Sequence, residues 1–280
     1  MNLYANLQQF KEDAAAGSLG NANNDLILRQ LQSVSRRIDQ EQNRMRDGYY
    51  VSEDTRYYPS HGAGFVNKED PTVLYLDEIA SIMSVKIDDD GDGVFETTLT
   101  ENEDYWLEPG HGAMRDMLKV NPNSSKLSRW PWAYRTIEVI GLFGYEKATE
   151  AVTTLAAELN TSATSATVAE GAFIYPGDTL WIGDEQLYVT GVAGDTLTIT
   201  RAVNGTTAAT HSNGASVLRH VWPPALVQAT VMLTARLFKR RESAYANVLL
   251  NSAEVGTIQT FRSIDPEAAL FFTRTYKAVA

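Results

Sequence analysis

The sequence predicts an α+β protein. Helices are expected before and after a long stretch of short antiparallel strands. Apolar side chains recur at helical spacing between Asp25 and Arg46. A second apolar run, over residues 225–238, follows Pro223-Pro224, and proline favours the first turn of a helix. Between these two segments, β-prone runs alternate with turns rich in Gly, Asp and Asn.

The N-terminal region predicts two helices. A short helix is expected over residues 3–15, before a Gly- and Asn-rich break. The longer helix has Asn24 as its expected N-cap, and Arg44 lies in its expected last turn, where the helix dipole favours cations. The residues of its apolar stripe are Ile27, Leu31, Val34, Ile38 and Met45.

Residues 49–145 change to short β-prone runs. The acidic segment from Asp88 to Gly93 lies between two of these runs and is typical of a hairpin turn. The expected strands are 55–58, 72–76, 83–87, 95–99, 105–107 and 136–143.

Residues 151–219 differ again, because they are rich in Thr, Ala, Gly and Val and poor in Lys and Arg. Short strands at even spacing indicate a small all-β sandwich or barrel, inserted between helical parts of the chain. The expected strands are 179–182, 186–189, 196–200 and 216–218, joined by turns at Gly183-Asp184, Gly194-Asp195, Asn204-Gly205 and Asn213-Gly214.

The helix expected after Pro223 is apolar on nearly every side, so we expect part of it to face a neighbouring subunit. Its cationic end supplies candidate residues for contacts between subunits: Phe238, Arg240 and Arg241. We expect residues 256–280 to form an extended tail, and this segment contains several aromatic residues.

Composition excludes several classes of protein. The chain has no cysteine, which excludes disulfides and thiolate chemistry. Its net charge of −11 disfavours gripping a nucleic acid backbone. The start has no signal-peptide pattern and no stretch is apolar enough to span a membrane, so we expect a soluble protein made in the cytoplasm.

Candidate chemical groups have simpler structural interpretations. Asp88, Asp90 and Asp92 fit the first half of a calcium loop, but Leu99 stands where a bidentate Glu is needed, which favours a plain hairpin turn. Glu101, Glu103 and Asp104 are interpreted as an acidic strand end rather than a glycosidase pair. The histidines lack metal-ligand spacing; they are His61, His111, His211 and His220. We therefore expect no cofactor and no catalysis, and a wall hydrolase is the least favoured alternative.

The order of three segments resembles the head–tail connector, or adaptor, proteins of tailed bacteriophages. The first segment is the helix from Asp25 to Asp39, followed by Thr55-Arg56-Tyr57-Tyr58. The second extends from Leu76 through the acidic turn to Pro109, and the third from Trp222 to Glu242. The insert at 151–219 departs from the minimal family pattern and is similar to small β modules of other phage structural proteins.

The resemblance implies a virion protein of the neck, assembled in the host cytoplasm as a ring of twelve copies between head and tail. Its partners would be the portal protein, a tail-side neck or tail-terminator protein and further copies of itself. Genomic DNA would pass through the lumen without specific binding, and no membrane is involved.

The resemblance also implies three parts in the chain. These are a discontinuous helical adaptor core with a small antiparallel sheet (1–150 and 220–255), the inserted β domain (151–219) and a C-terminal docking tail (256–280). Family members dock on the portal through the C-terminal segment. The corresponding candidates here are Phe261, Ile264, Phe271, Phe272 and Tyr276.

One alternative function belongs to a different class. The inserted β domain would bind a host-surface glycan or decorate the particle, with Trp181 and Tyr188 as an aromatic platform. Strand aromatics more often belong to a core, which weighs against this platform.

Overall fold

The computed structural model describes residues 2–14, 20–42, 44, 48–59, 65–110 and 115–241. These residues form two compact units. The first contains the described residues up to 44, then 148–203 and 207–241, and the second contains the described residues of 48–147 together with 204–206. The described residues are mixed helix and sheet with mostly β content, which is compatible with the predicted α+β class.

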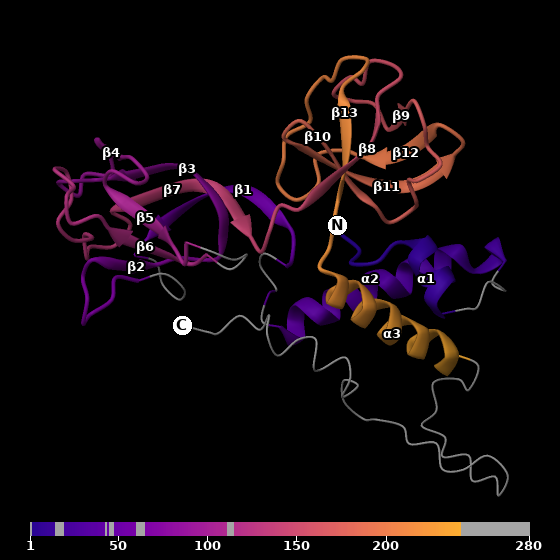
Figure 1. Ribbon diagram of the computed structural model, residues 1–280, viewed down its shortest axis with the longest axis horizontal. Helices are drawn as coiled ribbons and strands as arrows, with labels where there is room; N and C mark the ends of the chain where they lie inside the picture. The colour runs from indigo at the N-terminus through magenta and orange to yellow at the C-terminus, as the bar shows by residue number, and fades with distance from the viewer. Residues whose placement is uncertain are drawn as a thin grey trace, which may run out of the picture. The chain divides into compact units, whose positions relative to one another are not determined.

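Three α-helices belong to the first unit: α1 (Leu7–Ala14), α2 (Asn24–Glu41) and α3 (Pro224–Arg240), with a 3-10 turn η1 (Asn21–Asn23) before α2. The predicted stripe of α2 is buried from Ile27 to Ile38. Helix α3 packs against α1 and α2, so the two ends of the described chain meet in one helical layer (Figure 1). Helix α2 ends before Arg44, so the expected place of Arg44 in its last turn is wrong.

The predicted all-β domain is a six-stranded sheet in the first unit. Its strand order is β8-β13-β10-β11-β12-β9. The two edge strands meet where Ala156 N donates to Thr167 O (2.9 Å) and Ala169 N donates to Thr154 O (2.9 Å), which closes the sheet into a barrel. The strands are β8 (Thr149–Thr154), β9 (Ser165–Thr167), β10 (Thr179–Ile182), β11 (Glu185–Ala193), β12 (Thr196–Thr200) and β13 (Ser216–His220).

The N-terminal segment connects the barrel to the helical layer. Leu3, Tyr4 and Ala5 are almost fully buried. Leu7 N donates to Pro176 O (3.1 Å), and the ring of Tyr4 packs edge-on against Trp222 at 5.0 Å. A shared apolar cluster contains residues of the N-terminal segment, α1, α2, the barrel and α3: Leu3, Ala5, Leu7, Phe10, Ile27, Leu31, Tyr188, Val203 and Val231.

The observed elements and compact units can be compared with the three parts expected from the sequence. The expected boundaries of the insert, 151 and 219, lie close to the ends of the barrel at Thr149 and His220. The expected core, 1–150 and 220–255, put the helices together with the β-rich region before the barrel. In the structure the helices share their compact unit with the barrel instead.

The second unit consists of two antiparallel sheets that enclose one core. A four-stranded sheet has the order β1-β7-β3-β4 and a three-stranded sheet the order β2-β6-β5. The strands are β1 (Val51–Tyr58), β2 (Val73–Tyr75), β3 (Ile79–Ile87), β4 (Thr97–Leu99), β5 (Tyr105–Glu108), β6 (Met117–Val120) and β7 (Ile137–Gly144).

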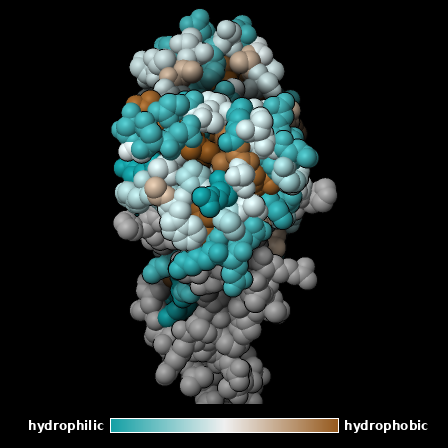
Figure 2. Space-filling model, turned by 90° about the vertical axis from the view of Figure 1, so that its left-hand side faces the viewer, coloured by the Kyte–Doolittle hydropathy of each residue, from teal (hydrophilic) through white to brown (hydrophobic). Residues whose placement is uncertain are grey.

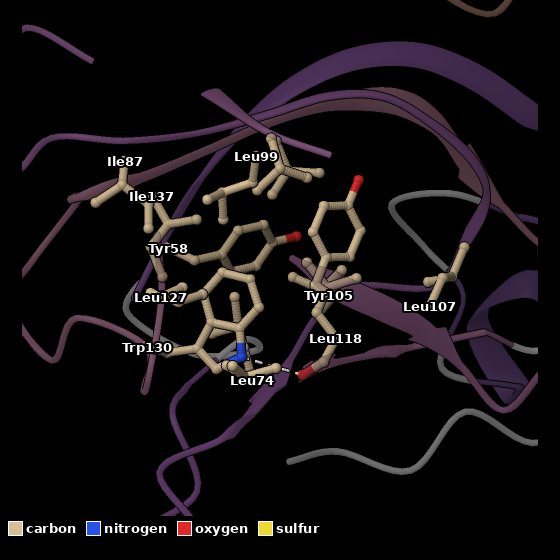
Figure 3. Packing of buried hydrophobic residues seen from close by; sticks show 14 of the residues in the cluster. Tyr58, Leu74, Ile87, Leu99, Tyr105, Leu107, Leu118, Leu127, Trp130 and Ile137 are labelled. Atoms are coloured by element: carbon tan, nitrogen blue, oxygen red, sulfur yellow. Dashed lines mark hydrogen bonds between the residues drawn. The ribbon is translucent and has the colours of Figure 1, made fainter. Parts of the chain in front are cut away.

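Large aromatic side chains fill this second core. Tyr58, Tyr105 and Trp130 lie among aliphatic side chains from both sheets (Figure 3). The indole nitrogen of Trp130 donates to the carbonyl oxygens of Thr72 (3.0 Å) and Leu118 (3.2 Å), so its polar group is satisfied in the interior. Burial of each of the surrounding aliphatic side chains stabilises the fold by about 1.5–3 kcal/mol.

Candidate functional site

The acidic turn, defined as residues 88–96 between β3 and β4, is the densest group of carboxylates among the described residues. One oxygen from each of Asp88, Asp90, Asp92 and Glu96 lies within 4.8 Å of the others. Such a set of hard oxygen ligands is the kind that Ca²⁺ and Mg²⁺ prefer.

The hydrogen bonds of the turn support the simpler interpretation. Asp88 is buried, and its two oxygens accept from the backbone N–H groups of Gly91 (2.6 Å) and Gly93 (2.9 Å). Both glycines have positive φ, +81° and +91°, which only glycine adopts without strain. Leu99, where the calcium loop needs a carboxylate, is buried in the core. Asp88 therefore organises the hairpin, and the outer carboxylates face solvent.

The candidate interface residues lie at the C-terminal end of α3. Phe238 is half-buried, and its ring packs edge-on against Phe10 of α1 at 6.1 Å. The guanidinium carbon of Arg241 lies 5.2 Å from the centre of the Phe238 ring, and Arg240 is exposed. Phe238 thus contributes to the packing of its own subunit, and a role of these three residues between subunits stays a prediction.

Helix α3 itself is less buried than its composition suggests. Its buried residues form one side, and the apolar residues beside them are half-buried. The buried set is Leu226, Ala229, Thr230, Val231 and Thr234. A neighbouring subunit is therefore not required to cover the whole circumference of this helix.

Several predicted positions lie outside the described residues. These are His61, His111 and the five candidates for portal docking: Phe261, Ile264, Phe271, Phe272 and Tyr276.

The two described histidines belong to the first unit and serve packing. His211 Nε2 lies 2.7 Å from Glu185 Oε2. The imidazole of His220 packs against Trp222, with 4.1 Å between ring centres, and the Trp181 indole nitrogen donates to His220 Nδ1 (3.3 Å). Neither histidine lies in a group with the donors of a metal site among the described residues.

Glu185 is a buried carboxylate that no sequence motif indicated. Arg201 donates to both of its oxygens at 2.6 Å, and the backbone N–H groups of Ala202 (3.2 Å) and Ala209 (3.1 Å) complete its shell with His211. Burial alone would raise the pKa of Glu185, but these hydrogen bonds outweigh it and hold the pKa below its ordinary value. The arrangement joins β11 to the segment after β12 and is structural.

The aromatic platform expected on the barrel is wrong. Trp181 is 1% exposed and Tyr188 is 7% exposed. Both rings point into the fold, Trp181 toward His220 and Tyr188 into the cluster shared with the helices. They offer no surface on which a sugar ring can stack.

The second unit carries a group of exposed aromatic side chains that no sequence motif indicated. The aromatic loop, defined as residues 129–135, precedes β7 and exposes 56% of Trp132 and 62% of Tyr134. Arg135 has φ +57°, and its guanidinium lies 4.4 Å from the centre of the Tyr57 ring. A hollow of about 220 Å³ lies beside this stack, lined by Thr55, Arg56, Tyr57, Tyr58, Asp77, Tyr134 and Arg135.

No protein-family model matches the chain, and a comparison with curated proteins finds no match. Among solved structures, the chain is similar to the Gp54 tailspike of Acinetobacter baumannii bacteriophage AP22, solved in complex with A. baumannii capsular saccharide. The identity is 20% and the TM-score 0.21, over 26% of this chain and 14% of the tailspike. Within the described ranges, no helix has both the length and the hydropathy needed to cross a membrane.

Proposed function

We propose that this chain is a structural virion protein, a subunit of the ring that joins the capsid portal to the neck or tail of a tailed bacteriophage. One observation carries the proposal. Helices α2 and α3, which contain most of the first and third segments of the resemblance, lie far apart in the sequence and pack against each other (Figure 1). An adaptor core built from both ends of the chain needs this contact.

The proposed mechanism is geometric and electrostatic and involves no catalysis. Head-to-tail contacts between identical subunits close into a ring when the rotation between neighbours divides the circle. Twelve copies would match the family. A net charge of −11 per subunit repels phosphates, so DNA would slide through the lumen without being held.

The portal and a tail-side neck or tail-terminator protein are the proposed partners of the two faces of the ring. Residues 256–280 would dock on the portal. The exposed cationic end of α3, with Arg240 and Arg241, would contact the next subunit.

Gold labelling of intact particles of the source phage tests the location. An antibody to this chain is expected to mark only the neck, between head and tail. Label on the capsid shell or the tail tip would overturn the connector proposal.

Portal docking is tested with a chain that ends at residue 255. This truncation is expected to retain the melting temperature of the full chain and to lose its binding to purified portal protein. Portal binding at the affinity of the full chain would contradict the docking role.

The alternative function is glycan binding by the barrel. The two aromatic side chains expected to form its platform, Trp181 and Tyr188, are buried. That alternative stays a prediction, which an array of host-surface glycans probed with the full chain would test.

A further inference from the structure

Two neighbouring segments of the second unit carry opposite charges. Residues 87–110 contain nine Asp and Glu and no Lys or Arg, whereas residues 117–137 contain four Lys and Arg and no acidic residue. The first segment includes the acidic turn and the second includes the aromatic loop. Most of these charges are exposed, including Asp90 and Asp92 on one side and Arg129 and Arg135 on the other.

The acidic turn and the aromatic loop lie side by side at one end of the four-stranded sheet. Asp88 N donates to Thr136 O (2.9 Å), which joins the start of the turn to the end of the loop. Tyr57 lies between them, with its ring centre 5.6 Å from that of Phe95 and 4.4 Å from the guanidinium of Arg135. The two segments are adjacent halves of one surface.

The aromatic loop is held in place before any partner binds. Its start is anchored by the buried Trp130, whose backbone N–H donates to Pro71 O (3.0 Å). Its end is fixed where Arg135 N donates to Pro59 O (3.2 Å) and Thr136 Oγ1 donates to Ala133 O (3.0 Å). A loop that is already ordered loses little conformational freedom on binding.

The exposed side chains of this surface are those that dominate protein interfaces. Trp132, Tyr134, Arg129 and Arg135 belong to the residue types enriched at interface hot spots. Val94 of the acidic turn adds a further apolar side chain that is 58% exposed. Figure 2, which faces the left-hand side of Figure 1, shows hydrophobic residues in a hollow surrounded by hydrophilic ones.

We propose that this end of the second unit binds a second copy of the chain, in a two-fold pair in which each aromatic loop packs on the acidic turn of the other copy. A surface with adjacent acidic and basic halves is complementary to itself after a rotation of 180°. The contact is isologous, so it is distinct from the head-to-tail contact that a ring needs. It goes beyond the proposed connector function and does not depend on it.

The test is sedimentation equilibrium of the purified full chain. We expect dimers that dissociate more readily at high salt, since the opposed charges attract less when screened. Trp132→Ala is expected to weaken dimerisation by about tenfold or more. Phe173→Ala, at a position of the first unit that is 59% exposed, is the matched control and should leave dimerisation unchanged.

Charge reversal tests the two-fold geometry. Arg129→Glu and Asp90→Lys are each expected to weaken self-association, because each homodimer then contains two repulsive contacts. A mixture of the two variants should form dimers again, since both contacts of the mixed dimer become attractive. A monomeric chain at all concentrations, or no recovery in the mixture, would overturn the proposal. Neck labelling is a separate readout, so failure of one proposal is distinguishable from failure of the other.

Discussion

The side-chain amide of Asn6 donates a 2.9 Å hydrogen bond to Asp178, a residue 172 positions further along the chain. Asn6 ends the buried N-terminal segment, and Asp178 directly precedes β10 of the barrel. Beside them, Thr179 Oγ1 donates to Asn2 Oδ1 (2.9 Å). These buried polar contacts connect the helical layer to the barrel.

Asn6→Ala should therefore destabilise the first unit. The variant leaves the buried Asp178 with one donor fewer, a loss that costs about 1–3 kcal/mol. Urea denaturation followed by circular dichroism measures the change. Gln8→Ala is the control, because the side-chain amide of Gln8 donates its hydrogen bond to Glu12 at the surface. Equal midpoints for the two variants would show that the Asn6 contact does not stabilise the fold.

A second prediction concerns the pH dependence of stability. Asp39 on α2 accepts from the Tyr4 hydroxyl and lies 3.0 Å from Arg36, yet burial raises the pKa of Asp39 to about 6. A group whose pKa is higher in the folded chain favours folding while it is protonated. Its contribution is full below the unfolded pKa near 3.8 and is lost as pH rises through about 6.

Asp39→Asn removes this titration. The stability of the native chain relative to the variant should fall between pH 4 and pH 7 by on the order of 2–3 kcal/mol. Urea denaturation of both proteins at several pH values measures the difference. Asp25→Asn, an exposed change on the same helix, is the control. Parallel curves for the native chain and Asp39→Asn would refute the assignment.

In the acidic turn, substitutions of Asp88 and Asp90 are predicted to have different effects on stability. Asp88→Ala leaves the N–H groups of Gly91 and Gly93 without their acceptor and should cost about 1–3 kcal/mol. Asp90→Asn keeps an oxygen for the Asp92 N–H and removes one of four close negative charges. It should be neutral or stabilising by a few tenths of a kcal/mol. Thermal melting in metal-free buffer compares the two.

The same melting experiment tests the turn as a cation site. The melting temperature is expected to be the same in calcium chloride as in sodium chloride of equal ionic strength. A rise with calcium that Asp90→Asn abolishes would show that the turn binds the ion and would contradict the simpler interpretation.

Local signals explain which elements were predictable. The turns at Gly183 and Gly194 need positive φ, which glycine supplies, so the hairpins of the barrel are encoded in adjacent residues. Helix α2 was predictable because its buried stripe repeats at helical spacing. Strands β8 and β9 were missed because their side chains are mostly exposed, so no apolar alternation marks them.

Contacts between distant residues explain what was not predictable. No local pattern pairs Asn6 with Asp178 or Tyr4 with Asp39, so the association of the helices with the barrel could not be inferred. The aromatic residues show the same limit. Trp130 is buried, and Trp132, two positions further on, is exposed. The feature that distinguishes Trp130 is the hydrogen bond from its indole nitrogen to the Thr72 carbonyl oxygen, a contact with a distant residue.

The last prediction concerns Glu185, the buried carboxylate of the barrel. Glu185→Gln leaves the Arg201 guanidinium, whose side chain is 8% exposed, without a compensating charge. Breaking one partner of a buried ion pair typically costs about 3–5 kcal/mol. Glu150→Gln is a matched control, because Glu150 pairs with Arg219 on the same barrel but is 49% exposed, and an exposed pair contributes about 1 kcal/mol or less. Urea denaturation should show a large loss for Glu185→Gln and a small one for Glu150→Gln. Equal losses would mean that the buried pair is no more important to the barrel than a surface pair.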